Sequence, residues 1–319
     1  MLDHATKAFF HLLAASGFLK TLASRYGMRA PTSFARRFIA GETVAEAIEV
    51  ARTVESRGFL HTLDFLGEGV TSLAEADAAT REYLQIINEI VRAGIGRNLS
   101  LKLTQLGLDV DRATAVDNLR RILDRAEEFF VRIDMENSRY TGVTLDVFET
   151  MWQQGYRHMG VVLQADLYRT EQDVRRIMAL GARIRLVKGA YKEPRSVAHQ
   201  KKADVNAAYA RLLKLLLTEG AYPAVATHDP EMIDLARRFA AEHRIPPDRF
   251  EFQMLYGIRR DLQAALLKEG HHVRVYIPFG RQWFPYFMRR LGERPANVAF
   301  VLRGLRGDSG RWPGAFAGS

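Results

Sequence analysis

From about residue 59 onward the chain repeats one pattern, in which a short run of β-forming residues is followed by a loop and then by a stretch of helical periodicity. Strands that alternate with helices pair in parallel through crossover connections, and eight such units predict a closed (β/α)8 barrel of the TIM type rather than an open sheet. The expected strands are 60–66, 99–104, 130–135, 160–164, 183–187, 223–227, 250–255 and 273–277.

The expected helices lie between these strands, at 73–93, 112–127, 144–154, 171–180, 196–219, 231–243 and 258–269, with an eighth at 282–291. A glycine follows several of them, where a left-handed residue commonly ends a helix; these glycines are Gly94, Gly155, Gly181, Gly220 and Gly270. We expect an N-terminal helical arm (1–58), the catalytic barrel (59–305) and a C-terminal tail (306–319).

Composition narrows the classes of protein that the chain can belong to. It contains no cysteine, which excludes a disulfide framework, thiolate nucleophiles, zinc–thiolate sites and iron–sulfur clusters. No metal is expected, and the composition suits the cytoplasm. The net charge is +9, but the basic residues are scattered and no nucleic-acid-binding motif is present. A solvated basic surface is therefore favoured over nucleic-acid binding.

The N-terminal residues 4–26 are expected to form an amphipathic helix. Their apolar run is too short to span a bilayer, so the apolar stripe is expected to dock on the protein itself. Peripheral contact with the inner face of the plasma membrane is the open alternative.

Several expected strands carry charged or polar residues, although parallel strands covered on both faces are usually continuous runs of Val, Ile and Leu. In 99–104 the leucines fill one face and Lys102 projects from the other, and Asp134 alternates with apolar neighbours in 130–135. The other residues of this kind are Gln164, Arg183, Arg185, Thr227, His228, Arg274 and Tyr276.

The leucine-rich faces should meet the helices, so the polar residues should point into the barrel or line its rim. Lys102 and Asp134, on successive strands, are placed to form an ion pair, whereas Arg132 and Arg274 are expected to have pairing or rim roles. For any one residue a structural ion pair is as common as a catalytic role. Convergence on the C-terminal ends of the strands, where barrel enzymes hold their active sites, favours catalysis.

The expected last helix has a second set of polar residues. Tyr286, Arg289 and Arg290 follow at i, i+3 and i+4, which places them on one side of the helix. Two adjacent guanidinium groups suit a carboxylate, because each planar fork can bind both oxygens. Arginines that merely face solvent are the alternative, which the aromatic residues of this helix disfavour.

Common nucleotide-binding signatures are absent: no G-x-G-x-x-G follows an expected strand and no Walker loop is present. Lys188-Gly189-Ala190 follows the fifth strand, where backbone N–H groups can bind a phosphate. Lys188 and Lys102 also leave open a Schiff-base lyase or aldolase with a lysine nucleophile. A non-catalytic module that binds a membrane or nucleic acid through its basic surface is the other alternative.

Eight segments occur in order from the second expected strand to the last helix: 102–107, 132–136, 160–165, 185–191, 226–228, 251–257, 274–278 and 286–291. As a set they resemble the proline dehydrogenase family in its monofunctional bacterial form, over roughly residues 60–300. The resemblance implies that the last barrel helix lies over the barrel mouth. It also implies oxidation of L-proline to 1-pyrroline-5-carboxylate by hydride transfer to N5 of a non-covalently bound FAD.

Residue roles follow from the resemblance. It implies that the proline carboxylate is bound by Arg289, Arg290 and Lys102, and that the proline ring is enclosed by Leu255, Tyr276 and Tyr286. Asp134 and Arg185 are implied to be catalytic, with Arg185 near flavin N5. The residues implied to contact FAD are Met135, Gln164, Arg185, Lys188, Gly189, Ala190, Thr227 and His228.

Partners are implied in the same way. A membrane quinone is the expected electron acceptor, and a separate aldehyde dehydrogenase should take the product towards glutamate, because the chain lacks the second domain of bifunctional relatives. The sequence departs from the family pattern at Asp166, where an aromatic residue is expected. This difference concerns a local contact near the flavin.

Overall fold

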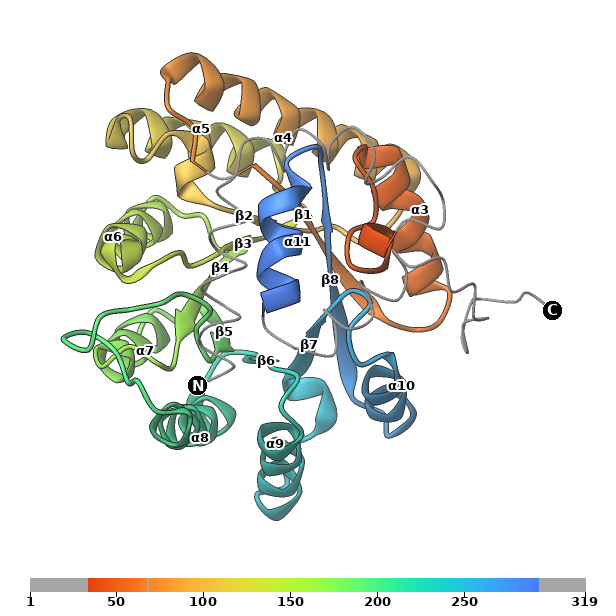
Figure 1. Cartoon of the computed structure of the whole chain (residues 1–319), viewed down its shortest axis with the longest axis vertical. Helices are drawn as coiled ribbons and strands as arrows, with labels where there is room; N and C mark the ends of the chain where they lie inside the picture. Colours follow the sequence, from red (N-terminus) through yellow and green to blue (C-terminus); the bar gives the residue numbers. More distant parts are fainter. Residues whose placement is uncertain (1–33, 68, 293–319) are drawn as a thin grey trace.

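The computed structural model describes residues 34–67 and 69–292. Eight parallel strands close into a barrel in sequence order, each pairing with the next and β8 with β1 (Figure 1). The strands are β1 (Leu60–Phe65), β2 (Asn98–Leu101), β3 (Phe130–Ile133), β4 (Met159–Gln164), β5 (Arg183–Val187), β6 (Ala224–Ala226), β7 (Glu251–Leu255) and β8 (His272–Phe279). The predicted (β/α)8 barrel is confirmed.

A helix follows each of the first seven strands and packs outside the barrel (Figure 1). These helices are α4 (Leu73–Ala93), α5 (Arg112–Arg125), α6 (Ser138–Gln153), α7 (Thr170–Met178), α8 (Lys202–Glu219), α9 (Pro230–Glu242) and α10 (Arg260–Lys268). Short 3-10 helices are η1 (Phe34–Arg37), η2 (Leu103–Leu106) and η3 (Pro247–Arg249). The order and type of the α-helices agree with the sequence-based expectation, which did not include the 3-10 helices.

The end of α8 differs from the prediction in its backbone conformation. Four of the five glycines have positive φ as expected, but Gly220 after α8 is extended, with a φ of −79°. A Cβ there would lie 2.5 Å from the Leu216 carbonyl oxygen, so the glycine allows a close backbone approach. The left-handed residue of this turn is Tyr222, with a φ of +49°.

The second strand is shorter than predicted. β2 ends at Leu101, and the chain turns through η2, which closes at Gly107 with a φ of +100°. Leu103 is buried within this turn and is not part of a strand. Because its side chain is apolar, the sequence pattern predicted that the strand continued through it. β3 likewise ends at Ile133, so Lys102 and Asp134 both lie just beyond their strands.

The two faces of the strands differ in chemistry. Residues such as Leu63, Leu101 and Ile133 belong to the large apolar cluster that also contains buried residues of the surrounding helices. The alternate positions carry Asp64, Ser100 and other polar side chains, and strand side chains alternate between faces. The interior of the barrel is therefore mainly polar, as the sequence pattern predicted.

The place of the eighth outer helix is taken by a helix from the N-terminal segment. α3 (Val44–Glu55) packs against β1, β8 and α4, although the sequence placed these residues in an arm outside the barrel. Its start is fixed by a capping box between Thr43 and Glu46. α3 (orange-red) thus covers the join between β8 and β1, beside α4 (Figure 1).

The helix after β8 is consequently free to lie elsewhere. α11 (Trp283–Gly292) packs in a second apolar cluster with η1, with Leu66 after β1 and with Ile258 after β7. These residues follow the C-terminal ends of their strands, so α11 lies across the mouth of the barrel (blue, centre of Figure 1). The expected position of the last helix is confirmed.

Two expectations lie outside the described residues: the amphipathic helix over 4–26 and the tail over 306–319. Within residues 34–67 and 69–292, no helix combines the length and hydrophobicity that crossing a bilayer requires. Peripheral membrane contact stays a prediction.

The turn after β7 contacts the end of η1, and a substitution in this turn tests whether the contact stabilises the fold. Gly257 has a φ of +77°, and a Cβ there would overlap the backbone carbonyl of Arg37. Gly257→Ala should therefore lower the free energy of unfolding by more than about 2 kcal/mol, since it adds a backbone clash to the cost of a left-handed alanine.

The control is Gly94→Ala, at a glycine with a φ of +66° and nothing within 4 Å of an added Cβ. Its cost should be limited to the conformational term, about 1–2 kcal/mol. Chemical denaturation of both variants measures the difference. Equal losses would mean that the contact with Arg37 does not hold this turn.

Candidate active site

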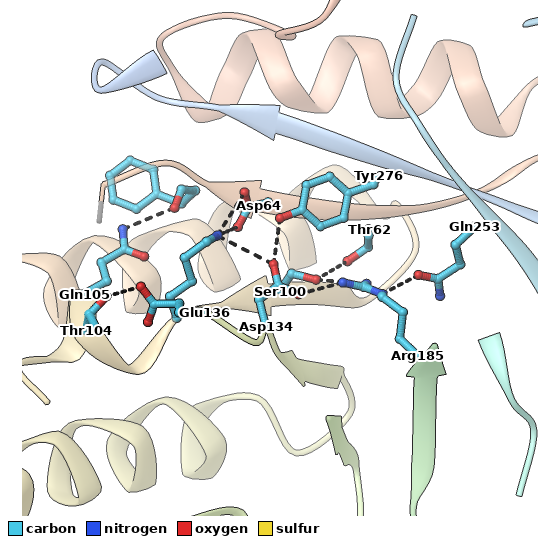
Figure 2. Close-up of polar contacts among 12 residues, drawn as sticks. Thr62, Asp64, Ser100, Thr104, Gln105, Asp134, Glu136, Arg185, Gln253 and Tyr276 are labelled. Atoms are coloured by element: carbon cyan, nitrogen blue, oxygen red, sulfur yellow. Dashed lines mark hydrogen bonds and ion pairs between the residues drawn. The ribbon is translucent and has the colours of Figure 1, made fainter. Parts of the chain in front are cut away.

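Four of the residues singled out in the sequence meet inside the barrel mouth. Asp134 accepts a hydrogen bond from Arg185 Nη1 at 2.6 Å and another from the Tyr276 hydroxyl at 2.7 Å. Lys102 Nζ lies 3.5 Å from Asp134 Oδ2, which confirms the predicted ion pair. Figure 2 shows Asp134 at the centre of this group, with Tyr276 and Arg185 directed towards it.

Strand register explains why these distant residues converge. Tyr276 of β8 pairs with Thr62 of β1, and Asp64 of β1 pairs with Ser100 of β2. Because parallel strands place neighbouring inward residues at similar heights, these side chains form adjoining layers within the barrel. Lys102 and Asp134 lie just beyond the C-terminal ends of β2 and β3, nearer the mouth.

Lys102 has a second carboxylate partner that the sequence analysis missed. Its Nζ lies 3.1 Å from Asp64 Oδ1, and both side chains are at least nine-tenths buried. Burial raises the pKa of Asp64, and Lys102 opposes this rise. The available signal was a carboxylate within the expected strand 60–66, the same departure from an apolar strand that singled out Asp134.

Arg185 is held from three sides. Besides Asp134, its guanidinium donates to Gln253 Oε1 at 2.5 Å and to Ser100 Oγ at 3.1 Å (Figure 2). Its carbon Cζ also lies 5.3 Å from the centre of the Tyr276 ring. Three hydrogen bonds and a ring contact leave the guanidinium little freedom, so its position is set before any ligand binds.

The support for Arg185 continues towards the other end of the barrel. The Gln253 amide donates to Glu251, whose carboxylate accepts from Arg274 Nε at 2.9 Å. This pair confirms the pairing role expected of Arg274. Arg132 instead donates to the carbonyl of Arg183 at 3.1 Å, and burial lowers its pKa. Gln253 and Ser100 were not identified from the sequence, although each is a polar residue within an expected strand.

Acidic and basic groups are matched in number around Asp134. Asp64 and Asp134 supply two carboxyl groups, and Lys102 and Arg185 supply two basic groups. Tyr276 stays neutral, because burial and the nearby Asp134 raise the pKa of its hydroxyl. An anionic ligand at the mouth would therefore depend on cations supplied from outside this group.

Such cations lie on α11. Arg289 and Arg290 are half-buried there, and Arg290 Cζ lies 5.1 Å from the centre of the Tyr286 ring. Tyr286 is buried in the apolar cluster at the mouth, and Leu255, the last residue of β7, packs against the same cluster. The structure thus brings Leu255, Tyr286 and the two arginines to the same end of the barrel as Lys102.

The residues expected to bind FAD follow the strands β3 to β6. Met135 is buried just after β3. Gln164 ends β4, and its amide donates to the backbone carbonyl of Glu136 at 2.8 Å; the Glu136 carboxylate accepts from Thr104 at 2.8 Å. These bonds fasten the β4 end to the loop that follows β3.

The other expected cofactor residues lie near the N-terminus of α9. Lys188 forms an ion pair with Asp229 at 2.5 Å, and Asp229 is the N-cap of α9. Thr227 accepts from the Asp229 backbone N–H at 3.1 Å, and His228 accepts from the Leu255 N–H at 2.9 Å. The ammonium group, the hydroxyl group and a helix N-terminus suit a phosphate-bearing ligand.

A family model described as proline dehydrogenase matches residues 47–303. The chain belongs to the proline dehydrogenase family. Among curated relatives, proline dehydrogenase 2 of Bacillus subtilis (strain 168) is 43% identical over 302 residues, which cover 94% of this chain and 98% of that protein. The proline dehydrogenase of Deinococcus radiodurans is 43% identical over 279 residues, 86% of this chain and 90% of that protein.

Longer relatives share the same domain. The bifunctional protein PutA of Escherichia coli (strain K12) is 29% identical over 313 residues, which make up 24% of that protein. The crystal structure of PutA from Bdellovibrio bacteriovorus, inactivated by N-propargylglycine, matches with a TM-score of 0.79 at 24% identity. The match covers 98% of this chain and 39% of that one, and it supports the barrel fold.

These comparisons confirm the resemblance carried by the eight sequence segments. The enzyme is an oxidoreductase that oxidises proline, and membership of the family implies a flavin cofactor.

The Asp64–Lys102 pair predicts how stability depends on pH. Lys102→Met leaves the Asp64 carboxylate buried with its main cationic partner removed, which should cost about 3–5 kcal/mol of unfolding free energy near pH 8. Loss of Lys102 raises the Asp64 pKa further above its unfolded value. The folded state then binds the proton more tightly than the unfolded state, so the cost should shrink as the pH falls towards 5.

Lys102→Met/Asp64→Asn is the matched control, because the acid that titrates has been removed. The double variant should be more stable than Lys102→Met at pH 8, with a smaller pH dependence. Denaturant unfolding at both pH values measures these differences. A single variant whose cost is the same at pH 5 and pH 8 would contradict this account.

Proposed function

We propose that the enzyme oxidises L-proline to 1-pyrroline-5-carboxylate with FAD as its cofactor, the first step of proline catabolism to glutamate. The observation that carries this proposal is the group Lys102, Asp134, Arg185 and Tyr276 beneath α11, with Arg289 and Arg290 at the same mouth. The match of residues 47–303 to the proline dehydrogenase family supports it.

The residues after β4, β5 and β6 fit a flavin nucleotide. Lys188, Thr227 and the start of α9 supply a cation, a hydroxyl group and a helix N-terminus for the phosphates. The turn at Gly189 has a φ of +115°, and an added Cβ would overlap the Asp166 carboxyl group, so only glycine fits there. We propose that Met135, Gln164, Arg185, Lys188, Gly189, Ala190, Thr227 and His228 hold the FAD.

Within such a site the flavin would supply one chemical property, the ability to accept the hydride that leaves proline. Arg185 would lie near flavin N5. Its guanidinium is already fixed by Asp134, Gln253 and Ser100, so the positive charge requires no rearrangement at the moment of reaction.

Proline itself would be held by its carboxylate. We propose that Arg289, Arg290 and Lys102 bind this group and that Leu255, Tyr276 and Tyr286 enclose the ring. The arginines of α11 lie at the same end of the barrel as the group around Asp134 and would supply two further cations for an anion. A clamped carboxylate orients the ring for hydride loss, which can lower the barrier by several kcal/mol.

The proline amine must be neutral when the hydride leaves. Nearby cations lower the pKa of the amine by like-charge repulsion. Asp134 is engaged by Arg185, Tyr276 and Lys102, which suits it to positioning these groups more than to taking a proton. We therefore propose that solvent accepts the ammonium proton and that no strong general base is required.

The Schiff-base alternative is disfavoured. A lysine nucleophile must be a neutral amine, yet Lys102 and Lys188 each lie within ion-pair distance of a carboxylate. Membership of the proline dehydrogenase family decides against an aldolase. We further propose a membrane quinone as electron acceptor, reached by peripheral contact from the cytoplasm, and a separate aldehyde dehydrogenase as the next enzyme.

The central test is whether L-proline reduces the bound flavin. The purified protein should be yellow, and addition of L-proline without oxygen should bleach the flavin absorbance. D-Proline is the control and should leave the spectrum unchanged. A colourless protein that does not take up added FAD, or a flavin that L-proline does not bleach, would contradict the proposed function.

The carboxylate clamp predicts a specific kinetic defect. Arg289→Lys and Arg290→Lys keep the charge but lose the planar fork, so kcat/KM should fall by at least about tenfold, chiefly through a higher KM. Steady-state kinetics with proline measure this effect. The matched control is Arg281→Lys, an exposed arginine just before α11, which should leave both constants close to the wild type. Near-wild-type kinetics in both clamp variants would remove the clamp from the mechanism.

A further inference from the structure

Asp166 lies in an unusual environment two residues beyond the end of β4. The residue is more than nine-tenths buried, and its Oδ1 atom has no hydrogen-bond partner among the described residues. A buried acceptor of this kind is costly when it carries a charge. The function proposed above assigns no role to this residue, which stands where the family pattern predicts an aromatic side chain.

The carboxyl group lies directly against the turn Lys188–Ala190. A Cβ added to Gly189 would overlap all three atoms of the Asp166 carboxyl group. The carboxyl group therefore fills the space that a side chain at Gly189 would occupy. A change in the charge or position of this group would therefore act on the backbone of the turn.

Backbone pairing holds the two segments together and prevents Asp166 from moving away. The Asp166 N–H donates to the Lys188 carbonyl at 2.9 Å, and the His199 N–H donates to the Asp166 carbonyl at 2.8 Å. Leu167 forms an antiparallel bridge with Ala198. The Asp166 side chain is thus fixed between the Lys188–Ala190 turn and the segment that follows it.

The charged and titratable groups near Asp166 come from two segments. Lys188, Glu193 and His199 belong to the segment that packs against Asp166, and Arg169 lies three residues after Asp166 in the chain. Lys188 and Arg169 each form an ion pair with another carboxylate, and His199 contacts Asp166 through its backbone. Glu193 is the charge that acts on Asp166. Burial, followed by repulsion from Glu193, raises the pKa of Asp166 to about 7.

Glu193 is itself held in place by hydrogen bonds. Its two carboxylate oxygens accept from the backbone N–H of Ser138 at 2.7 Å and from the Ser138 hydroxyl at 2.5 Å. Ser138 is the first residue of α6, where the helix dipole favours a negative charge. The Glu193 carboxylate is therefore held at the place from which it repels a charge on Asp166.

We propose that Asp166 is a positioning residue for the Lys188–Ala190 turn, and that its protonated form is the one that supports bound flavin. This inference rests on the proposed binding of FAD at that turn. A ligand against the turn removes more water from the Asp166 carboxyl group, which favours its neutral form. By linkage, flavin binding and proton binding then strengthen each other.

The test follows flavin release from the holoenzyme. The enzyme is diluted between about pH 6 and about pH 8.5, and the rise in flavin fluorescence gives the release rate. Wild-type release should accelerate several-fold as the pH rises through about 7, where Asp166 ionises. Asp166→Asn, which cannot ionise, should release flavin at a rate that does not change with pH.

Two further variants identify the titrating group. Glu193→Gln removes the like charge, so the midpoint of the pH dependence should move to lower pH. Asp117→Asn, an exposed acid on α5, is the matched control and should retain the wild-type profile.

A second measurement needs no flavin. Thermal unfolding of Asp166→Asn should lose less stability than the wild type between pH 5.5 and pH 8.5, because an acid with a raised pKa destabilises the fold as it ionises.

The outcomes separate the two proposals. A yellow protein whose flavin release is independent of pH, or in which Asp166→Asn follows the wild-type profile, overturns the role of Asp166 alone. A protein that binds no flavin at any pH overturns the proposed function and this inference together. A flat profile in Asp166→Asn, a lower midpoint in Glu193→Gln and an unchanged profile in Asp117→Asn establish the role.

Discussion

The structure depends on the pairing of charges inside the barrel. An isolated ionised side chain in a low-dielectric interior is so costly that it either finds partners or loses its charge. Here Asp64, Lys102, Asp134 and Arg185 form one continuous set of ion pairs and hydrogen bonds. Gln253 links this set to the Glu251–Arg274 pair further down the barrel.

This pairing also serves chemistry. Each member of the network restricts its neighbours, so Arg185 and Tyr276 are held in one geometry without a ligand. Preorganised charges of this kind stabilise a reaction more effectively than flexible ones, because they do not need to reorient as charge develops. In the proposed function, the arginines of α11 take part in the recognition of an anion.

The arrangement of two helices gives the barrel its asymmetric mouth. α3 covers β1 and β8 on the outside, where an eighth barrel helix would otherwise pack. α11 can then lie across the C-terminal ends of the strands, held by η1 and by residues that follow β1 and β7. The exchange places aromatic residues and arginines over a polar interior, which a regular barrel helix on the outside could not do.

The sequence by itself determined the barrel, the order of its elements and the polar character of its interior, because periodicity and alternation are local properties that neighbouring residues reveal. It also identified Lys102, Asp134, Arg185 and Tyr276, because charged or polar groups within parallel strands contradict the usual apolar pattern. Asp64 and Gln253 were not singled out from the sequence, although each is a polar residue within an expected strand. Their roles depend on Lys102 and Arg185, which belong to other parts of the chain.

Only the tertiary structure decided which of these groups meet. Strand register fixed Asp134 as the shared partner of Arg185, Tyr276 and Lys102, and no local pattern specifies a contact between residues 142 positions apart. The structure likewise moved α3 from the expected arm into the helical ring, because the choice depends on which surface of the barrel lacks a helix. It also placed the Asp166 carboxyl group against Gly189, where burial and a neighbouring charge, which are three-dimensional quantities, determine its protonation.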